Sequence, residues 1–135
     1  VPITKHLRLV KELLDETLAT YPIDPKRVYI MGISMGAIAT LDMVYRFPDT
    51  FAKAVSICGA TNIERMREFK GKTKFRLYHG DIDDVIPVTY SREAYEALKS
   101  TGKKVEYIEF YGANHNAWHP AFNTPDFLQW TFKKK

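Results

Sequence analysis

Short apolar runs rich in β-branched residues alternate with stretches of helical periodicity along the 135 residues, and this alternation restricts the fold most. The first run, residues 27–31, is nearly continuously apolar, which is typical of a strand covered on both faces of a parallel sheet. Strands that alternate with helices require right-handed crossovers. The chain is predicted to be an α/β protein, a three-layer α/β/α sandwich with a mostly parallel sheet. Further strands are expected near residues 51–57, 74–78 and 104–110, and helices near residues 3–19, 35–47, 62–69, 89–101 and 125–132. The first helix is expected to be amphipathic, with an apolar face made of Ile3, Leu7, Val10, Leu14 and Leu18.

The composition fits one globular domain covering residues 1–135. With 45% hydrophobic residues the chain can bury a core, and no run approaches the roughly 18 apolar residues of a membrane-spanning helix. Residues 1–8 lack the apolar core of a signal peptide, so a soluble chain is expected; no compartment is indicated, and a secreted or periplasmic protein is compatible with the sequence. The net charge of +4 comes from lysines spread over turns and the C-terminus, so no nucleic-acid partner is expected. The single cysteine, Cys58, follows an apolar run and is expected to be buried.

Residues 32–36 read Gly-Ile-Ser-Met-Gly, a G-x-S-x-G motif between a predicted strand and a predicted helix. This context favours a nucleophile elbow, a turn of five residues so tight that side chains at the two glycines would collide with neighbouring backbone. Ser34 would be strained, with its hydroxyl projecting above the sheet. Because Met35 begins the helix, its N–H is expected to be the first donor of an oxyanion hole. The alternative is an ordinary glycine-rich turn before a helix.

A serine hydroxyl becomes a nucleophile only when a base removes its proton, so Ser34 requires a histidine oriented by an acid. Two loops that follow predicted strands supply them, at the same edge of the sheet. The first loop offers three carboxylates, Asp81, Asp83 and Asp84, and the second offers His115. The chain order serine, acid, histidine is the order expected after a nucleophile elbow.

These residues also fit other roles. The acidic cluster also fits a solvated turn or a helix cap, and His79, which ends a predicted strand, fits a structural hydrogen-bonding role. His119, four residues past His115, is the one serious rival histidine. A metal site of His115, His119 and the aspartates lacks the glutamate of H-E-x-x-H and leaves the elbow serine unexplained. No metal is therefore expected.

With elbow, acid loop and histidine loop in this order, the sequence resembles the α/β-hydrolase superfamily. The nearest branch contains phospholipase/carboxylesterases, predicted peptidases, dienelactone hydrolases and polyhydroxybutyrate depolymerase-like esterases. Nearly the whole chain takes part in the resemblance, which rests on residues 21–29 before the elbow, His79-Gly80 with Asp83 and Pro87, and Gly112 with residues 115–118. The family spacing to the apolar pair and proline selects Asp83 as the acid, with Asp84 and Asp81 as alternatives.

The resemblance implies a serine esterase that uses Ser34, Asp83 and His115 and forms an acyl-enzyme without a cofactor. The implied substrates are small-molecule or carbohydrate esters, including acetyl and feruloyl groups of plant cell walls. Trp118 is expected either to wall the substrate site or to pack behind the histidine loop. Two alternatives stay open: a serine peptidase or acyltransferase of the same fold, and a non-catalytic binding module that keeps the fold.

The chain departs from the family in length. The family fold has about eight strands, and only the last four are expected here, so the N-terminal half and the second oxyanion-hole donor are predicted to be absent. The strand at Val28–Met31 would then present an unpaired apolar edge. We expect that self-association or a missing N-terminal segment covers this edge.

Overall fold

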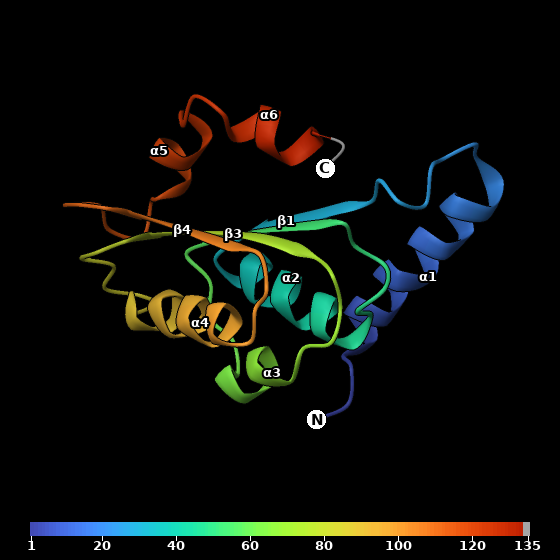
Figure 1. Ribbon diagram of the computed structural model, residues 1–135, viewed down its shortest axis with the longest axis horizontal. Coiled ribbons are helices and arrows are strands. Elements are labelled where there is room, and N and C mark those ends of the chain that lie inside the picture. The colour runs from blue at the N-terminus through green and yellow to red at the C-terminus, as the bar shows by residue number, and fades with distance from the viewer. Residues whose placement is uncertain (134–135) are drawn as a thin grey trace.

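A computed structural model describes residues 1–133 and contains a four-stranded, all-parallel sheet with the order β1-β2-β3-β4. Neighbours in the sheet are also neighbours in the chain, so each crossover connects adjacent strands (Figure 1). The predicted α/β sandwich with a parallel sheet is confirmed. The strands are β1 (Tyr29–Ile33), β2 (Lys53–Ile57), β3 (Lys74–Gly80) and β4 (Val105–Phe110).

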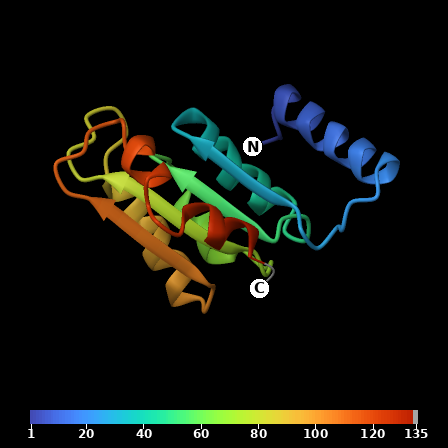
Figure 2. The ribbon, with the colours of Figure 1, turned by 90° about the horizontal axis from the view of Figure 1, so that it is seen from above.

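Helices cover both faces of the sheet (Figure 1). One face carries α2 (Met35–Arg46), α3 (Ile63–Glu68) and α4 (Thr89–Ser100), and the other carries α5 (Trp118–Phe122) and α6 (Phe127–Phe132). In Figure 2 the two C-terminal helices lie in front of the strands, and α2 and α4 lie behind them. The sequence predicted a single final helix and missed α5, where Pro120 interrupts the helical pattern. Proline is tolerated there because the N–H groups of a first helical turn have no partner within the helix.

The sheet separates two apolar cores. Alternate residues of each strand face opposite sides, so Phe75 and Leu77 pack toward α2 and α4, whereas Tyr78 packs toward α5 and α6. Cys58 is fully buried in the second core, as predicted. Strand β2 is buried along its whole length, including Lys53 and Ser56, and its other residues, Ala54, Val55 and Ile57, are apolar.

Helix α1 (Lys5–Thr20) lies beside this sandwich and has no buried residue (Figure 2). The Thr4 side chain caps it by accepting a hydrogen bond from the Leu7 N–H at 3.3 Å. The periodicity correctly predicted that Leu7, Leu14 and Leu18 face the first core. Val10 was placed on the same face and is instead 50% exposed. The exposed side of α1 therefore carries three apolar side chains, Leu9, Val10 and Leu13.

Strand β1 forms one edge of the sheet and pairs only with β2 among residues 1–133. Its side chains Met31 and Ile33 are 42% and 36% exposed. An apolar strand with free backbone groups is a template for pairing with another strand. None of the described helices is long and apolar enough to cross a membrane.

Candidate active site

Ser34 lies at the point where β1 ends and α2 begins. Strand β1 runs on to Ile33 and α2 starts at Met35, so the predicted five-residue turn is wrong, and a single residue makes it. Ser34 achieves this reversal with a φ of 57° and a ψ of −116°, a conformation that residues with a Cβ rarely adopt. Its N–H donates to the Ile57 carbonyl at 2.8 Å, and its carbonyl accepts the Ala37 and Ile38 N–H groups at 2.9 and 3.1 Å. The neighbouring strand and the first turn of α2 therefore hold the strained residue.

The two glycines of the motif are not equivalent. A Cβ added at Gly32 would lie 2.1 Å from the Gly36 carbonyl oxygen and 2.7 Å from the Thr40 Oγ1, so the predicted collision is confirmed there. A Cβ added at Gly36 would meet nothing within 4 Å among the described residues. The steric requirement predicted for Gly36 is thus wrong for this part of the chain. The close approach runs from strand β1 to the helix backbone, and only Gly32 faces it.

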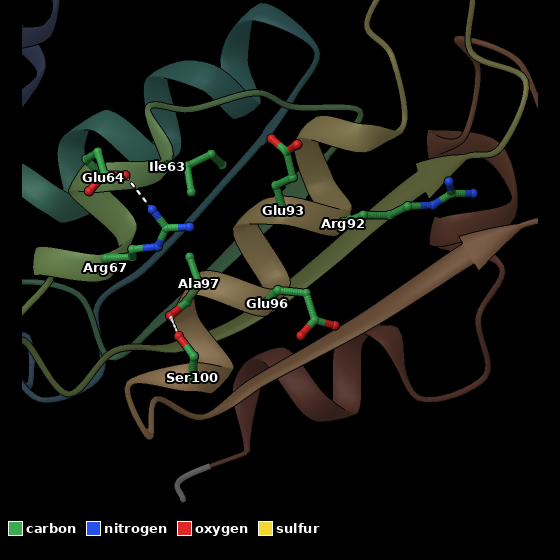
Figure 3. A pocket seen from close by; sticks show the side chains of 8 residues that line it. All are labelled: Ile63, Glu64, Arg67, Arg92, Glu93, Glu96, Ala97 and Ser100. Carbon is green, nitrogen blue, oxygen red and sulfur yellow. Dashed lines mark hydrogen bonds and ion pairs between the residues drawn. The ribbon is translucent and has the colours of Figure 1, made fainter.

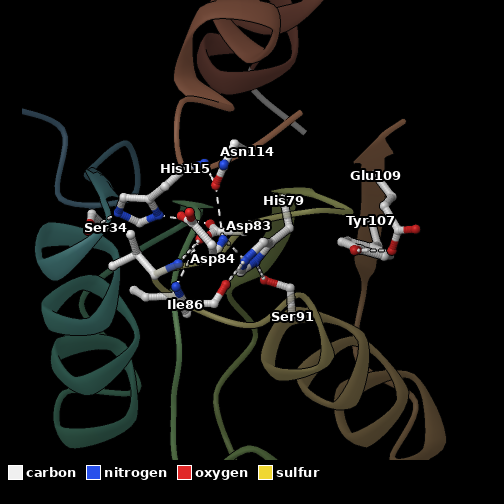
Figure 4. Close-up of polar contacts among 11 residues, drawn as sticks. Ser34, His79, Asp83, Asp84, Ile86, Ser91, Tyr107, Glu109, Asn114 and His115 are labelled. Atoms are coloured by element: carbon white, nitrogen blue, oxygen red, sulfur yellow. Dashed lines mark hydrogen bonds and ion pairs between the residues drawn. The ribbon is translucent and has the colours of Figure 1, made fainter. Parts of the chain in front are cut away.

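The structure brings Ser34, His115 and Asp83 together from three different loops (Figure 4). The Ser34 Oγ lies 2.7 Å from the His115 Nε2, and the His115 Nδ1 lies 2.8 Å from the Asp83 Oδ2. A carboxylate can only accept, so the His115 Nδ1 carries a proton and donates it to Asp83. The Nε2 is then free to accept the Ser34 hydroxyl proton. We call Ser34, His115 and Asp83 together the relay, since a serine nucleophile requires this arrangement.

Asp83 is buried and fully hydrogen bonded. Its Oδ1 accepts the backbone N–H groups of Val85 and Ile86 at 2.9 and 2.8 Å, while its Oδ2 accepts from His115. Burial acts to raise the pKa of Asp83, but the hydrogen bond from His115 and those from the Ile86 and Val85 amides outweigh it, so the pKa is lowered. The carboxylate form is therefore favoured at this position.

The two alternative acids lie elsewhere in the loop. The Asp81 Oδ1 accepts the Gly112 N–H at 2.7 Å, and the Asp84 N–H donates to the Asn114 side chain at 2.9 Å. Both contacts tie the acid loop to the segment that carries His115. Gly80 allows the same approach: a Cβ there would lie 2.2 Å from the Ala113 carbonyl oxygen. The sequence did not indicate these contacts between the two loops.

The remaining predicted residues border these three. Met35 is the first residue of α2, where N–H groups have no acceptor within the helix. The Trp118 ring meets the His115 ring edge to face with centroids 6.2 Å apart, and it also packs against the second core. The Trp118 ring therefore packs against the second core and also lies against His115. His119 is exposed and faces Asn123, with 3.3 Å between its Nδ1 and the amide nitrogen.

A family model described as phospholipase/carboxylesterase matches residues 2–129. The chain belongs to the phospholipase/carboxylesterase family. A solved structure of a thermostable esterase superposes with a TM-score of 0.91 at 30% identity, over 96% of this chain and 37% of that one.

Two curated relatives match shorter stretches. A poly(3-hydroxyalkanoate) depolymerase of Paucimonas lemoignei is 44% identical over 50 residues, which cover 37% of this chain and 12% of that protein. A bifunctional acetylxylan esterase/xylanase of Neocallimastix patriciarum is 30% identical over 83 residues, which cover 62% of this chain and 12% of that protein. The chain thus spans well under half the length of each of these family relatives.

Two residues of the relay, together with Cys58, have side chains that could bind a metal ion. Ligand atoms of Cys58, Asp83 and His115 lie within 4.8 Å of one another. Burial raises the pKa of the Cys58 thiol, which favours the protonated form, whereas metals bind the thiolate. His119 is not part of this cluster, so the alternative site with His115 and His119 is not assembled. The cluster fits a serine relay better than a metal centre.

Two grooves in the described residues differ in character. One of about 500 Å³ lies beside the relay and is mainly apolar; its wall includes Ile38 from α2, Val85 to Pro87 from the acid loop, and Tyr90 from α4. Ile38 donates its N–H to the Ser34 carbonyl, so this groove begins one helical turn from the serine. The other, of about 560 Å³, lies between α3 and α4 and is lined mostly by charged side chains (Figure 3). Neither groove is lined by Ser34, His115 or Asp83, but the first shares Ile38, whose N–H donates to the Ser34 carbonyl, and Val85 and Ile86, whose N–H groups donate to Asp83. The first groove is therefore the candidate substrate site.

Proposed function

We propose that this family member is a serine esterase that cleaves carboxylic esters with Ser34, His115 and Asp83. The observation that carries the proposal is the 2.7 Å contact between the Ser34 Oγ and the His115 Nε2. In the proposed reaction the Ser34 oxygen attacks the ester carbonyl while its proton moves to the Nε2. The same proton then leaves with the alcohol as the C–O bond breaks, giving an acyl-enzyme. Water, deprotonated by His115, hydrolyses the acyl-enzyme and restores Ser34.

Asp83 has a supporting role in this proposal. It keeps the His115 proton on Nδ1 and stabilises the imidazolium that forms when Nε2 takes the serine proton. Its buried, fully hydrogen-bonded carboxylate supports that role. The Met35 N–H would stabilise the negative oxygen of the tetrahedral intermediate. A second donor would come from outside this chain, and losing one such donor typically costs about 10²- to 10³-fold in rate.

The substrate class is proposed from the groove beside Ser34. Its apolar wall suits an acyl or alcohol group with a hydrocarbon or aromatic face, and carbohydrate-linked acetyl or feruloyl esters are the proposed natural substrates. The acetylxylan esterase named among the relatives favours the carbohydrate-linked ester. A feruloyl group, which is aromatic and larger than an acetyl group, would fill more of the groove of about 500 Å³.

The direct test is hydrolysis of nitrophenyl esters by the full-length protein. Ser34→Ala is expected to abolish turnover and labelling by a fluorophosphonate, which reacts with an activated serine. Full turnover by Ser34→Ala would mean that another residue is the nucleophile. Absence of labelling in the folded protein would favour a non-catalytic binding module. Faster cleavage of peptides or transfer to an alcohol acceptor would instead indicate a peptidase or an acyltransferase.

We also propose that the domain is larger than these 135 residues and that the free edge of β1 is covered, by a further segment of the protein or by a second copy. The exposed Met31 and Ile33 support this, as does the 37% coverage of the solved esterase. Sedimentation and thermal melting of the isolated 135 residues test it. A cooperatively folding monomer would contradict the proposal.

A further inference from the structure

We propose that His79 is a positioning residue that fixes the acid of the relay, with its own ring held by Ser91; this rests on the proposed esterase function. His79 is fully buried in β3, outside the relay. Its Nε2 lies 2.8 Å from the Ile86 carbonyl oxygen and 3.3 Å from the Asp83 Oδ2, and its Nδ1 lies 2.7 Å from the Ser91 Oγ (Figure 4). Asp83 therefore lies between two imidazoles, those of His79 and His115.

The partners of His79 determine where its proton sits. The Nε2 faces a carbonyl and a carboxylate oxygen, and both can only accept. The Nε2 must therefore carry a proton, because a bare nitrogen there would face two acceptors in a buried site. In the neutral ring the Nδ1 then accepts, and the Ser91 hydroxyl, which can donate, satisfies it. Removing that hydroxyl would leave the buried Nδ1 without its hydrogen-bond donor.

The two contacts of the His79 Nε2 join both ends of the acid loop. The loop bends so that the Ile86 N–H donates to the Asp83 Oδ1. His79 holds the same two residues from the other side, through the Ile86 carbonyl and the Asp83 Oδ2. The Asp83 oxygens thus accept three hydrogen bonds, from the Val85 and Ile86 amides and from His115, and the His79 Nε2 lies 3.3 Å from the Oδ2 as a further contact. Together these contacts restrict the orientation of the carboxylate.

This arrangement transfers the rigidity of the sheet to a loop. His79 lies in β3 and Ser91, 3% exposed, lies in α4, so regular elements hold both. Asp83 itself lies in the connection between those elements. Positioning errors of about 1 Å can cost on the order of 10²-fold in rate even when they arise away from the chemistry. His79 is therefore expected to affect kcat without touching the substrate.

The test compares His79→Leu with His79→Gln in the full-length protein. Glutamine places an amide N–H near the position of the Nε2, whereas leucine keeps the volume and removes the donor. We expect His79→Leu to lower kcat for a nitrophenyl ester by about 10²-fold with little change in KM, and His79→Gln to recover at least about tenfold of that loss. Equal losses in the two variants, or wild-type kcat in a folded His79→Leu, would overturn the proposal.

A second pair of variants covers a His79→Leu protein that does not fold. Ser91→Ala removes the hydroxyl that bonds to the His79 Nδ1, and Ser100→Ala, a matched control, removes an exposed hydroxyl from the same helix. Ser91→Ala is expected to lower kcat and Ser100→Ala to leave it unchanged. Equal kcat values for wild type and Ser91→Ala in this pair would refute the role of the hydroxyl.

One readout does not depend on catalysis. The downfield proton NMR resonance of the His115 Nδ1–H requires an ordered hydrogen bond to Asp83, so it should broaden or vanish in His79→Leu and persist in His79→Gln. An unchanged resonance in His79→Leu would overturn the positioning role. If the wild-type protein hydrolyses no ester, the esterase proposal fails, and this resonance still decides whether His79 orders Asp83.

Discussion

Adding one methyl group at Gly32 tests whether the geometry of the elbow depends on a close backbone approach. In Gly32→Ala the new Cβ would lie 2.1 Å from the carbonyl oxygen and 2.2 Å from the carbonyl carbon of Gly36. Ordinary contacts between such atoms are longer by roughly 1 Å or more, so either β1 or the first turn of α2 must move by that amount. Neither is a flexible side chain end, and the moving turn carries Ser34 and Met35.

The expected cost has two parts. Overpacking of this kind typically destabilises by about 1–3 kcal/mol, which corresponds to a fall in melting temperature of roughly 3–10 °C for a domain of this size. A shift of about 1 Å in the serine relative to His115 is expected to lower kcat by about 10²-fold. Gly36→Ala is the matched control, because its methyl group meets no described atom and alanine favours a helix by up to about 1 kcal/mol over glycine.

Thermal melts and nitrophenyl ester hydrolysis on both variants provide the measurements. We expect Gly32→Ala to lose stability and activity and Gly36→Ala to keep both. Wild-type stability and turnover in Gly32→Ala would show that the approach of β1 to α2 is not a constraint. Similar damage from both substitutions would show that something outside the described residues crowds Gly36.

Three further predictions concern charge and burial. The Arg92 hydrogen bond lowers the pKa of Glu109 to about 2, so Glu109→Gln should reduce the melting temperature near neutral pH, and the difference should shrink as the pH falls from 4.5 toward 2; a constant difference would contradict this. Because burial raises the pKa of the Cys58 thiol, a chromogenic disulfide reagent should react only after unfolding, and immediate reaction would refute its burial. In denaturant titrations Asp126→Ala should cost about 2 kcal/mol, since it strips a partner from the buried Arg76. Arg76→Met should stay within about 1 kcal/mol, since it removes the buried charge, frees two exposed carboxylates and loses a 3.4 Å contact to the Tyr78 hydroxyl; a larger loss for Arg76→Met than for Asp126→Ala would contradict this prediction.

Local sequence patterns predicted most of the helices and strands. The strand at Lys53–Ile57 was predictable because both of its faces are buried, so three of its five residues are apolar. The elbow was recognisable because the turn, the strand before it and the helix after it are all local in sequence. Elements with irregular or short patterns were harder: α5 was missed because Pro120 interrupts its periodicity. Val10 was assigned to the wrong side of α1 because Leu9 and Leu13 leave that helix apolar around much of its circumference.

The sequence by itself determined the alternation of strands and helices, the elbow at Ser34 and the loops that contain Asp83 and His115. It could do so because each depends on residues close together in the chain. Only the tertiary structure decided that Gly32 and not Gly36 meets backbone, and that the His79 Nε2 lies 3.3 Å from the Asp83 Oδ2. These contacts join a strand, a loop and a helix whose spacing depends on packing across the sheet. Packing distances of this kind leave no periodic trace in a single sequence.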